Sequence, residues 1–336
     1  GYMGNKHAPI GDDDIASSVT LTGQAVIKYS NELIKEFIKK EIPDISDSEL
    51  EGCIIYNDTD SSYVSITPLV NKGLKFLDGE DIHTDTFDKI QEIEDHLNQG
   101  VGEWAKKALL SKDNRFIFKR ECIADVGVFL QKKRYVMHIL DDEGIKENKF
   151  KYTGVEVVRT TMPNAIKPYA KKIIETMLTT QSLSKTNELL NETYEIFKGL
   201  DPQELAFVMG VKGYEKYATQ CNQFTTTKGM PIHVKSAYFY NLLLDKLNTG
   251  NKYEAIGTGD KVRYMYIEQP NKFGLESIGF KYDYPKEFSD LFKPDYDKMF
   301  EKILFQAIER FYDNVGWKIR KPSENVTVEL FDLFGK

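Results

Sequence analysis

Hydrophobic positions recur every three or four residues in two long stretches of the first third of the chain. This spacing places apolar side chains along one face of an α-helix. We therefore predict helices over residues 16–40 and 84–111. The positions that form the two apolar faces are Val19, Val26, Ile27, Leu33, Ile34, Phe37 and Ile38 in the first helix, and Phe87, Ile90, Ile93, Leu97, Val101, Trp104 and Leu109 in the second.

Between and after these helices, apolar residues alternate with polar ones, which is typical of strands. Residues 54–66 contain two short runs of this kind around an Asn-Asp turn, and they predict a β-hairpin. Residues 115–141 contain three further strand-like runs, which the turn residues Asp142 to Gly144 end. The order of helix, hairpin, helix and strands predicts an α+β fold, in which an antiparallel sheet is backed by helices.

The second half of the chain has a different character. Residues 163–200 are mostly helical, and helices and short strands then alternate up to Pro294. A last helix is expected over residues 296–314.

This change predicts three parts along the chain. We place a first domain at residues 1–157 and a mainly helical second domain with short strands at 158–325. A C-terminal peptide, residues 326–336, follows a polar break. Large apolar residues crowd into its last positions, where chain ends are usually polar.

Composition and charge narrow the class of protein only a little. The 336 residues suffice for two domains, and 45 basic against 52 acidic side chains give a net charge of −7. An acidic balance does not favour nucleic-acid binding over the whole surface, so contact with phosphates needs local basic patches. Cys53, Cys122 and Cys221 are far apart and odd in number, which indicates a reducing compartment without a disulfide framework.

The chain shows no targeting segment. No apolar run approaches the ~20 residues that cross a bilayer, and no secretory signal opens the sequence. The first residue is Gly1 rather than methionine. We therefore expect either that residues were removed or that the chain is a piece of a larger polypeptide.

Two carboxylates occupy the predicted hairpin turn. Asp58 and Asp60 lie two positions apart between runs of β-branched and aromatic residues. Hard divalent cations such as Mg²⁺ prefer carboxylate oxygens, so a rigid hairpin tip of this kind suits phosphoryl-transfer chemistry. The simpler interpretation is a plain acidic turn, because Asn and Asp favour turns without any function.

A basic run, Lys132, Lys133, Arg134 and Tyr135, follows later in the same domain. It leads directly into an apolar strand, which we expect in the same sheet as the hairpin. Basic side chains near paired carboxylates suit a nucleic-acid backbone that passes a metal site. The simpler alternative is a solvated basic run at the start of a strand.

Other segments carry weaker candidates. Glu121 lies on the strand-like run that begins at residue 115, where an outward charge is the ordinary interpretation. His233 and Lys235 lie near a predicted helix start, and Lys212 precedes a glycine turn, so these side chains are candidate phosphate donors. A lone histidine is more often a core or surface residue.

The C-terminal peptide carries a short apolar motif. Its anchors are Leu330, Phe331, Leu333 and Phe334. Anchors of this kind fill a pocket on a partner protein, and a docked helical turn is the alternative.

The order of these motifs resembles the C-terminal portion of T4-like bacteriophage family B DNA polymerases. Tyr56-Asn-Asp-Thr-Asp-Ser61 is similar to the metal-binding hairpin of the family's palm domain, with Asn57 where the family usually has glycine. Lys132-Lys-Arg-Tyr135 is similar to the palm motif that holds the primer strand near its 3′ end. Gly1-Tyr-Met-Gly-Asn5 and Thr22-Gly-Gln24 resemble the segment that follows the fingers.

The resemblance implies roles for the palm residues. Asp60 would be a ligand shared by two Mg²⁺ ions, and Asp58 would be a neighbouring carboxylate with a weaker role. Glu121 would lie beside the metal site as a second-shell group. Lys133 and Tyr135 would be the principal contacts to the primer strand.

The same resemblance makes residues 1–157 the later part of the palm and 158–325 the thumb. Lys212, His233 and Lys235 would then face the backbone of the primer–template DNA. The peptide with Leu330, Phe331, Leu333 and Phe334 would bind the sliding clamp, although Gly335-Lys336 stands where the family pattern has a further aromatic residue.

The expected function is template-directed DNA synthesis from dNTPs. The family's first metal-binding Asp, the fingers residues that hold the nucleotide and the proofreading exonuclease are not found in this sequence. We therefore expect the chain to be inactive alone and to act with an N-terminal polymerase chain, in the cytoplasm of an infected bacterium if a phage encodes it. One alternative is a non-catalytic DNA-binding replisome scaffold that binds the clamp, and another is a metal-dependent hydrolase with an acidic hairpin.

Overall fold

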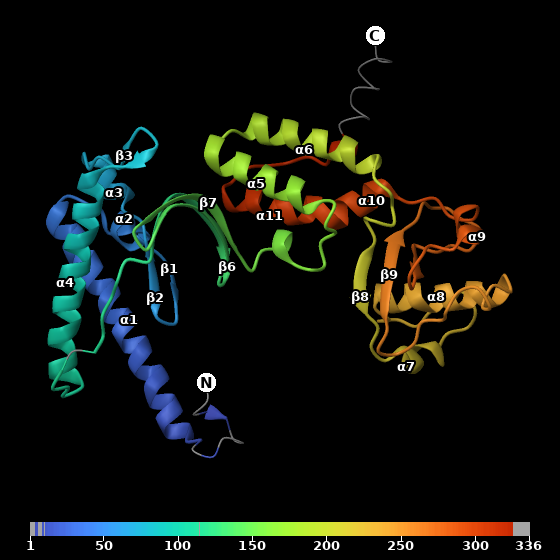
Figure 1. The fold of residues 1–336 in the computed structure, drawn as a ribbon, viewed down its shortest axis with the longest axis horizontal. Helices are drawn as coiled ribbons and strands as arrows, with labels where there is room; N and C mark the ends of the chain where they lie inside the picture. The colour runs from blue at the N-terminus through green and yellow to red at the C-terminus, as the bar shows by residue number, and fades with distance from the viewer. Residues whose placement is uncertain (1–3, 6–8, 10, 114, 325–336) are drawn as a thin grey trace, which may run out of the picture. The chain divides into compact units, whose positions relative to one another are not determined.

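A computed structural model describes the chain except for residues 1–3, 6–8, 10, 114 and 325–336. The chain folds into two compact units, Gly1–Lys151 and Tyr152–Lys336. The fold is α+β, as the sequence predicts, with small antiparallel sheets and helices in both units (Figure 1). That the units are palm and thumb remains a proposal.

The described residues of the first unit form two long helices, two short ones and seven strands. The helices are α1 (Asp13–Glu41), α2 (Asp47–Gly52), α3 (Thr67–Asn71) and α4 (Thr84–Ala108). The strands are β1 (Ile54–Asp58), β2 (Ser61–Val64), β3 (Leu77–Asp78), β4 (Asp81–Ile82), β5 (Cys122–Gln131), β6 (Arg134–Asp142) and β7 (Ile145–Thr153), the last of which runs across the division between the units.

Helices α1 and α4 run alongside each other and hold the largest core of this unit (Figure 1). Their close approach depends on Gly100, because a Cβ there would lie 2.6 Å from Cδ1 of Leu33. Burial along α1 begins at Val26, so Val19 is exposed, contrary to the predicted apolar face. Leu109, predicted for the apolar face of α4, is also exposed, at 40%, just after that helix ends.

Two separate antiparallel sheets carry the candidate motifs of this unit. The β1–β2 hairpin forms one sheet, and β5, β6 and β7 form the other in that order. The expectation that the hairpin and the strand after the basic run share one sheet is therefore wrong. The hairpin and the three-stranded sheet meet through side chains instead, which a pattern of alternating residues cannot distinguish from strand pairing.

The segment before β5 also differs from the prediction. Residues 115–121 form neither a strand nor a helix. Asn98 on α4 binds both backbone groups of Phe118, at 2.8 and 2.9 Å, and Glu94 accepts from the amide of Arg120 at 2.9 Å. Helix side chains thus satisfy the polar backbone groups that a neighbouring strand would otherwise pair.

The second unit combines a helical layer with a small sheet. Its helices are α5 (Lys167–Thr180), α6 (Leu183–Lys198), α7 (Tyr214–Ala218), α8 (Ile232–Lys246), α9 (Lys286–Ser289), α10 (Tyr296–Phe300) and α11 (Gln306–Asn314), with a 3₁₀ turn at Glu156–Val158. Strands β8 (Phe207–Gly210), β9 (Lys261–Tyr266) and β10 (Ser277–Phe280) form an antiparallel sheet in the order β10-β9-β8.

The expected last helix forms with one local change. A π-helical turn, Glu301–Phe305, joins α10 to α11, so the chain is helical from Tyr296 to Asn314. Against the sheet, α8 packs on β10, and the buried hydroxyl groups of Ser236 and Ser277 lie 2.7 Å apart. Within the described residues, no helix is both long enough and apolar enough to span a bilayer.

Candidate functional site

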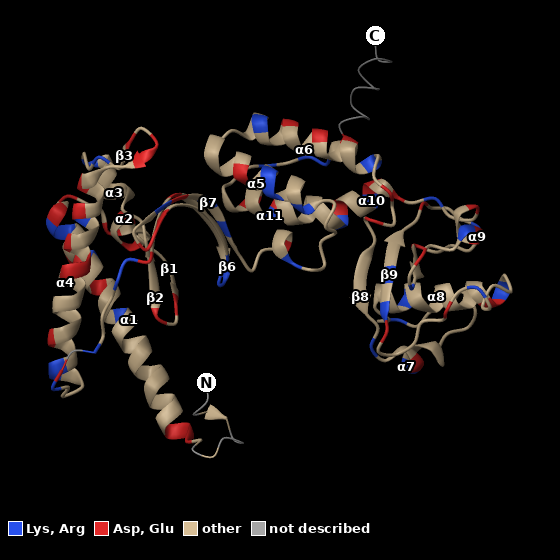
Figure 2. Ribbon diagram, in the orientation of Figure 1, with Lys and Arg blue, Asp and Glu red and all other residues tan. Residues whose placement is uncertain are grey.

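The acidic tip of one hairpin and the basic turn of another come together in the first unit. Asp58 pairs with Ser61, so Thr59 and Asp60 form the tip of the β1–β2 hairpin. Gln131 pairs with Arg134, so the two lysines between them form the tight turn of the β5–β6 hairpin. Figure 2 shows the acidic and the basic residues at these neighbouring hairpin ends.

Two contacts join the ends directly. The backbone amide of Lys133 donates a hydrogen bond to the hydroxyl of Tyr56, at 3.0 Å. The ammonium group of Lys133 lies 3.4 Å from Oδ1 of Asp58. The Lys133 side chain is 62% exposed, so its ion pair with Asp58 is a weak one in water.

An aromatic cluster lies behind these contacts and consists of Tyr56, Tyr63, Phe129 and Tyr135. The ring centroids lie 5.0–6.1 Å apart, the range in which aromatic rings attract one another. The hydroxyl groups of Tyr63 and Tyr135 form a hydrogen bond of 2.7 Å. Burial, and then this hydrogen bond, raise the pKa of Tyr63 well above its ordinary value.

Both turns hold a non-glycine residue in the left-handed backbone region. The φ angle is +50° at Thr59 and +59° at Lys133. For an L-residue this conformation costs about 1–2 kcal/mol, and strained positions of this kind gather at functional sites. A register shift in β5 between Phe129 and Gln131 adds a local irregularity beside the basic turn, where it redirects side chains.

Exposure separates the site residues into two groups. Asp60, Lys132 and Lys133 are exposed, and Asp58 is half-buried. Tyr135 is only 6% exposed, and its hydroxyl is already bonded to Tyr63. The lysines and the tip carboxylates therefore face solvent and any ligand, whereas the tyrosine belongs to the cluster that supports them.

Glu121 lies outside the hairpin tip. Its carboxylate is exposed and forms an ion pair with Lys151, at 3.3 Å. It is close enough to Tyr63 to contribute slightly to the raised pKa of that residue. Among the described residues, no three His, Cys, Asp or Glu side chains are grouped so as to hold a metal ion.

The candidates in the second unit lie around the starts of two helices. Lys212 is exposed in the turn before α7, where Gly213 adopts the left-handed φ of +65°. His233 and Lys235 lie half-buried in the first turn of α8. Burial lowers the pKa of His233, so this imidazole is neutral at physiological pH. Leu330, Phe331, Leu333 and Phe334 lie outside the described residues.

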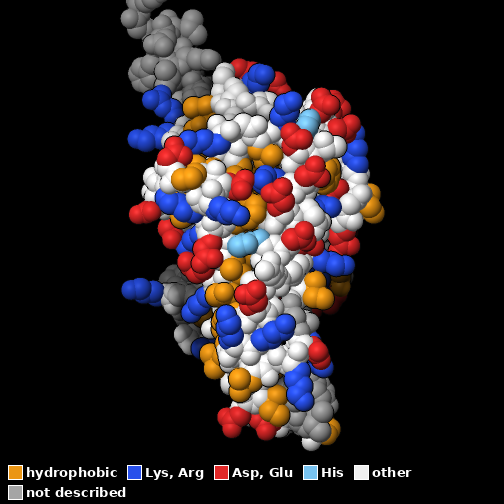
Figure 3. All heavy atoms as spheres, turned by 90° about the vertical axis from the view of Figure 1, so that its left-hand side faces the viewer, with side chains coloured by type: hydrophobic (Ala, Val, Ile, Leu, Met, Phe, Trp, Pro, Cys, Tyr) orange, Lys and Arg blue, Asp and Glu red, His pale blue; other side chains and the backbone are white. Residues whose placement is uncertain are grey.

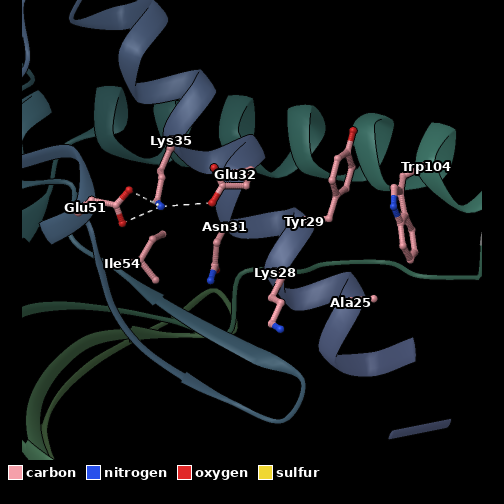
Figure 4. A pocket seen from close by; sticks show the side chains of 9 residues that line it. All are labelled: Ala25, Lys28, Tyr29, Asn31, Glu32, Lys35, Glu51, Ile54 and Trp104. Carbon is pink, nitrogen blue, oxygen red and sulfur yellow. Dashed lines mark hydrogen bonds and ion pairs between the residues drawn. The ribbon is translucent and has the colours of Figure 1, made fainter. Parts of the chain in front are cut away.

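A pocket lies away from the hairpin tip. It has a volume of about 600 Å³ and lies between α1, the start of β1 and the end of α4. Figure 4 shows Lys35 in this pocket between Glu51 and Glu32. Its ammonium group lies 2.7 Å from a carboxylate oxygen of Glu51 and 3.2 Å from one of Glu32, and these carboxylates offset its charge. Lys28 also lines the pocket, and the rings of Tyr29 and Trp104 stack on its other side, 5.7 Å apart.

The outer face of the first unit has no single sign of charge. Figure 3 shows Lys and Arg side chains interspersed with Asp and Glu over this face. The hairpin ends are the better candidate for the functional site, because exposed lysines and carboxylates from two separate motifs meet there.

The aromatic cluster was not predicted as a unit. Tyr56 and Tyr63 lie the same number of residues before and after the acidic turn, and they pair directly across the hairpin. Their spacing in the sequence could therefore have indicated that both rings lie on the same face of the hairpin. Nothing in the local sequence indicates that Phe129 and Tyr135 cover that same face. Their contact depends on how two separate hairpins pack.

Comparisons with known proteins find a family model and a phage relative that match this chain. The family model for DNA polymerase family B matches residues 117–315. The chain is 26% identical over 355 aligned residues to a DNA-directed DNA polymerase of Escherichia phage RB69. The alignment covers 99% of this chain and 37% of that protein, so the chain spans little more than a third of its relative's length.

Proposed function

The chain belongs to the family B DNA polymerases, and from this premise we propose that it supplies the second metal-binding motif and the primer-holding turn of a replicative DNA polymerase. The proposed reaction is template-directed nucleotidyl transfer from a dNTP to the 3′ end of a primer. The observation that carries the proposal is the 3.4 Å approach of Lys133 to Asp58, which joins the two motifs in one site.

Asp58 and Asp60 fit a magnesium site by their chemistry. Both offer carboxylate oxygens at a two-residue hairpin tip, and Asp60 is exposed there. Magnesium, when bound, supplies positive charge that lowers the pKa of the attacking hydroxyl and offsets the charge on the phosphates. Asp60 is the proposed ligand of both ions, and Asp58 the auxiliary carboxylate. Glu121, with its Lys151 partner, is proposed to adjust the charge nearby.

The remaining ligands have to come from another segment. Two carboxylates at one tip leave most of the coordination shell of two Mg²⁺ ions unfilled, and the described residues offer no third acidic, His or Cys group at this place. We therefore propose that the first palm Asp, the fingers and the exonuclease belong to an N-terminal polymerase chain that works with this one.

The basic turn is proposed to hold the primer strand. Lys132 and Lys133 are exposed and close to the carboxylates, so they would bind backbone phosphates beside the reacting end. In the second unit, Lys212 and Lys235 would bind phosphates farther along the duplex. His233 would contribute as a neutral hydrogen-bond donor, because burial lowers its pKa.

The C-terminal peptide is proposed to bind a sliding clamp. The proposal rests on the sequence alone, through Leu330, Phe331, Leu333 and Phe334. Aromatic and aliphatic anchors of this kind bind by filling a pocket on the partner.

Primer extension tests the proposed function. We expect extension of a labelled primer with Mg²⁺ and dNTPs when the chain is mixed with a polypeptide that carries the preceding polymerase segments, and none with either alone. Asp60→Ala in the mixture should abolish extension while primer–template binding persists. Efficient synthesis by this chain alone would contradict the need for a partner.

The scaffold hypothesis predicts a different result. A non-catalytic DNA-binding protein would retain its full effect on a polymerase after Asp60→Ala, because it uses no metal ligand. Loss of extension in the Asp60→Ala mixture, with DNA binding unchanged, would therefore exclude the scaffold.

A further inference from the structure

We infer that Tyr56 is a positioning residue for Lys133, and that it aligns the primer-holding turn with the carboxylate tip. The inference rests on the proposed function and assigns a role to a hydroxyl group outside the metal-binding and DNA-binding residues. Tyr56 lies on β1, two positions before Asp58, and its hydroxyl accepts the backbone amide of Lys133. The short strand β1 thus carries both the Asp58 carboxylate and the Tyr56 hydroxyl that binds the basic turn.

The Tyr56 ring is held from three sides. Its centroid lies 5.4 Å from Tyr63, 6.0 Å from Phe129 and 6.1 Å from Tyr135. These neighbours leave the ring few rotamers, so the hydroxyl stays at one place relative to β1. Because the hydroxyl of Tyr56 is held in one position, it can restrain the backbone amide that donates a hydrogen bond to it.

The turn at Lys133 needs such an acceptor. Lys133 has a φ of +59°, a conformation that an L-residue adopts only when its surroundings impose it. In a two-residue turn, the amide of Lys133 would otherwise point to water, and the backbone would be free to relax. The bond to Tyr56 selects the left-handed conformation and so sets the direction in which the side chain leaves the backbone.

Little else orients the Lys133 side chain. It is 62% exposed, and among the described residues its side chain makes one ion pair, the weak one with Asp58. A mobile lysine binds phosphate with less favourable entropy than one whose backbone is held. Loss of the Tyr56 hydroxyl should therefore weaken the phosphate contact of Lys133 without removing any group that touches DNA.

Hydrogen exchange tests the anchoring itself. Tyr56→Phe keeps the ring and removes the hydroxyl, so exchange at the Lys133 amide of the full chain should accelerate several-fold. The matched control is Tyr29→Phe, because Tyr29 stacks on Trp104 and its hydroxyl has no hydrogen bond to any described residue. Equal exchange at Lys133 in wild type and Tyr56→Phe would overturn the inference.

A double-mutant cycle tests the consequence for DNA. A hydrogen bond of ordinary net strength corresponds to about a 2- to 12-fold change in an equilibrium constant. We expect Tyr56→Phe to weaken the binding of a fluorescent primer–template by a factor in this range. Combined with Lys133→Ala, it should add nothing to the effect of Lys133→Ala alone. A merely structural role would make the two effects multiply, and that result would overturn the inference.

The two experiments separate this inference from the proposed function. If wild type binds no primer–template, the proposed function fails and the inference about DNA fails with it. If wild type binds DNA and Lys133→Ala weakens binding, but Tyr56→Phe changes neither exchange nor affinity, only the role of Tyr56 is refuted. Tyr29→Phe should match wild type in both measurements.

Discussion

The hydroxyl groups of Tyr63 and Tyr135 lie 2.7 Å apart, although the two residues are 72 positions apart in the chain. Tyr63 lies on the hairpin that carries the acidic tip, and Tyr135 lies on the strand that follows the basic turn. Their rings pack at 5.3 Å, so both the ring contact and the hydrogen bond join the two motifs. This pair contributes to the burial of Tyr135, which is 6% exposed.

Removing one partner of this pair should reduce stability. Tyr63→Phe leaves the buried hydroxyl of Tyr135 without its bond, which should lower the free energy of unfolding by about 1–2 kcal/mol. Urea denaturation of the full chain measures this change. Tyr29→Phe is the control and should leave stability within error of wild type.

The pair should also behave as a unit. Because removal of both partners leaves no unsatisfied group, Tyr63→Phe with Tyr135→Phe should cost less than the sum of the two single changes. A strictly additive cost would show that the two hydroxyl groups do not stabilise each other.

Lys132 should contribute to DNA binding through charge alone. A lysine that neutralises one phosphate of B-DNA changes the slope of log K against log salt by about 0.9. Lys132→Ala should reduce that slope by this amount and weaken binding to all sequences equally. Fluorescence anisotropy over a range of salt concentrations measures it. Lys40→Ala, an exposed lysine at the end of α1, should leave the slope unchanged.

Close packing in the second unit depends on Gly279. A Cβ at this position of β10 would lie 2.7 Å from the carbonyl oxygen of Ser236 on α8 and 2.9 Å from Cγ2 of Val262. Gly279→Ala should therefore destabilise the protein by about 2–3 kcal/mol, because neither backbone can give way without disturbing the α8–β10 contact.

Urea denaturation can compare the stability loss of Gly279→Ala with that of a glycine-to-alanine substitution at an open position. Gly210→Ala, on β8, adds a Cβ that meets nothing within 4 Å. This control should change the free energy of unfolding far less than Gly279→Ala. Similar losses in the two variants would contradict the packing argument.

The acid stability of the second unit should depend on Glu287. The ammonium of Lys252 and the hydroxyl of Tyr253 donate to this carboxylate at 2.8 and 2.9 Å, and with the backbone they lower its pKa to about 2. A lowered pKa means that the contribution to stability is full above the ordinary value of 4.5 and is lost as the pH falls toward 2.

Glu287→Gln should remove this pH-dependent contribution to stability. The stability difference between wild type and the variant should be constant above pH 5 and should shrink toward pH 2, as urea denaturation at each pH measures. Glu268→Gln is the control, since the Glu268 side chain makes no ion pair with any described residue. A difference that does not change with pH would contradict the assignment.

Local sequence patterns predicted the long helices and the acidic hairpin of the first unit, together with the last helix of the second. The long helices α1 and α4, the β1–β2 hairpin and the last helix follow from periodicity and turn residues. Strand β7 was missed because its residues are mostly charged or polar, and it forms only as the edge partner of β6. Residues 115–121 carry a strand-like pattern, yet Asn98 and Glu94 bind their backbone where a strand would have done so.

The sequence by itself determined the two turns and the charges they carry. The turn that carries Asp58 and Asp60 and the basic run Lys132–Lys133 before a strand follow from local turn residues and alternation, whereas the tight turn of the two lysines appears only in the structure. Only the tertiary structure decided that the turns meet, that Tyr135 is buried and that Tyr56 holds the amide of Lys133. The physical reason is that these contacts join residues more than 70 positions apart, and a local pattern carries no information about which apolar faces pack together.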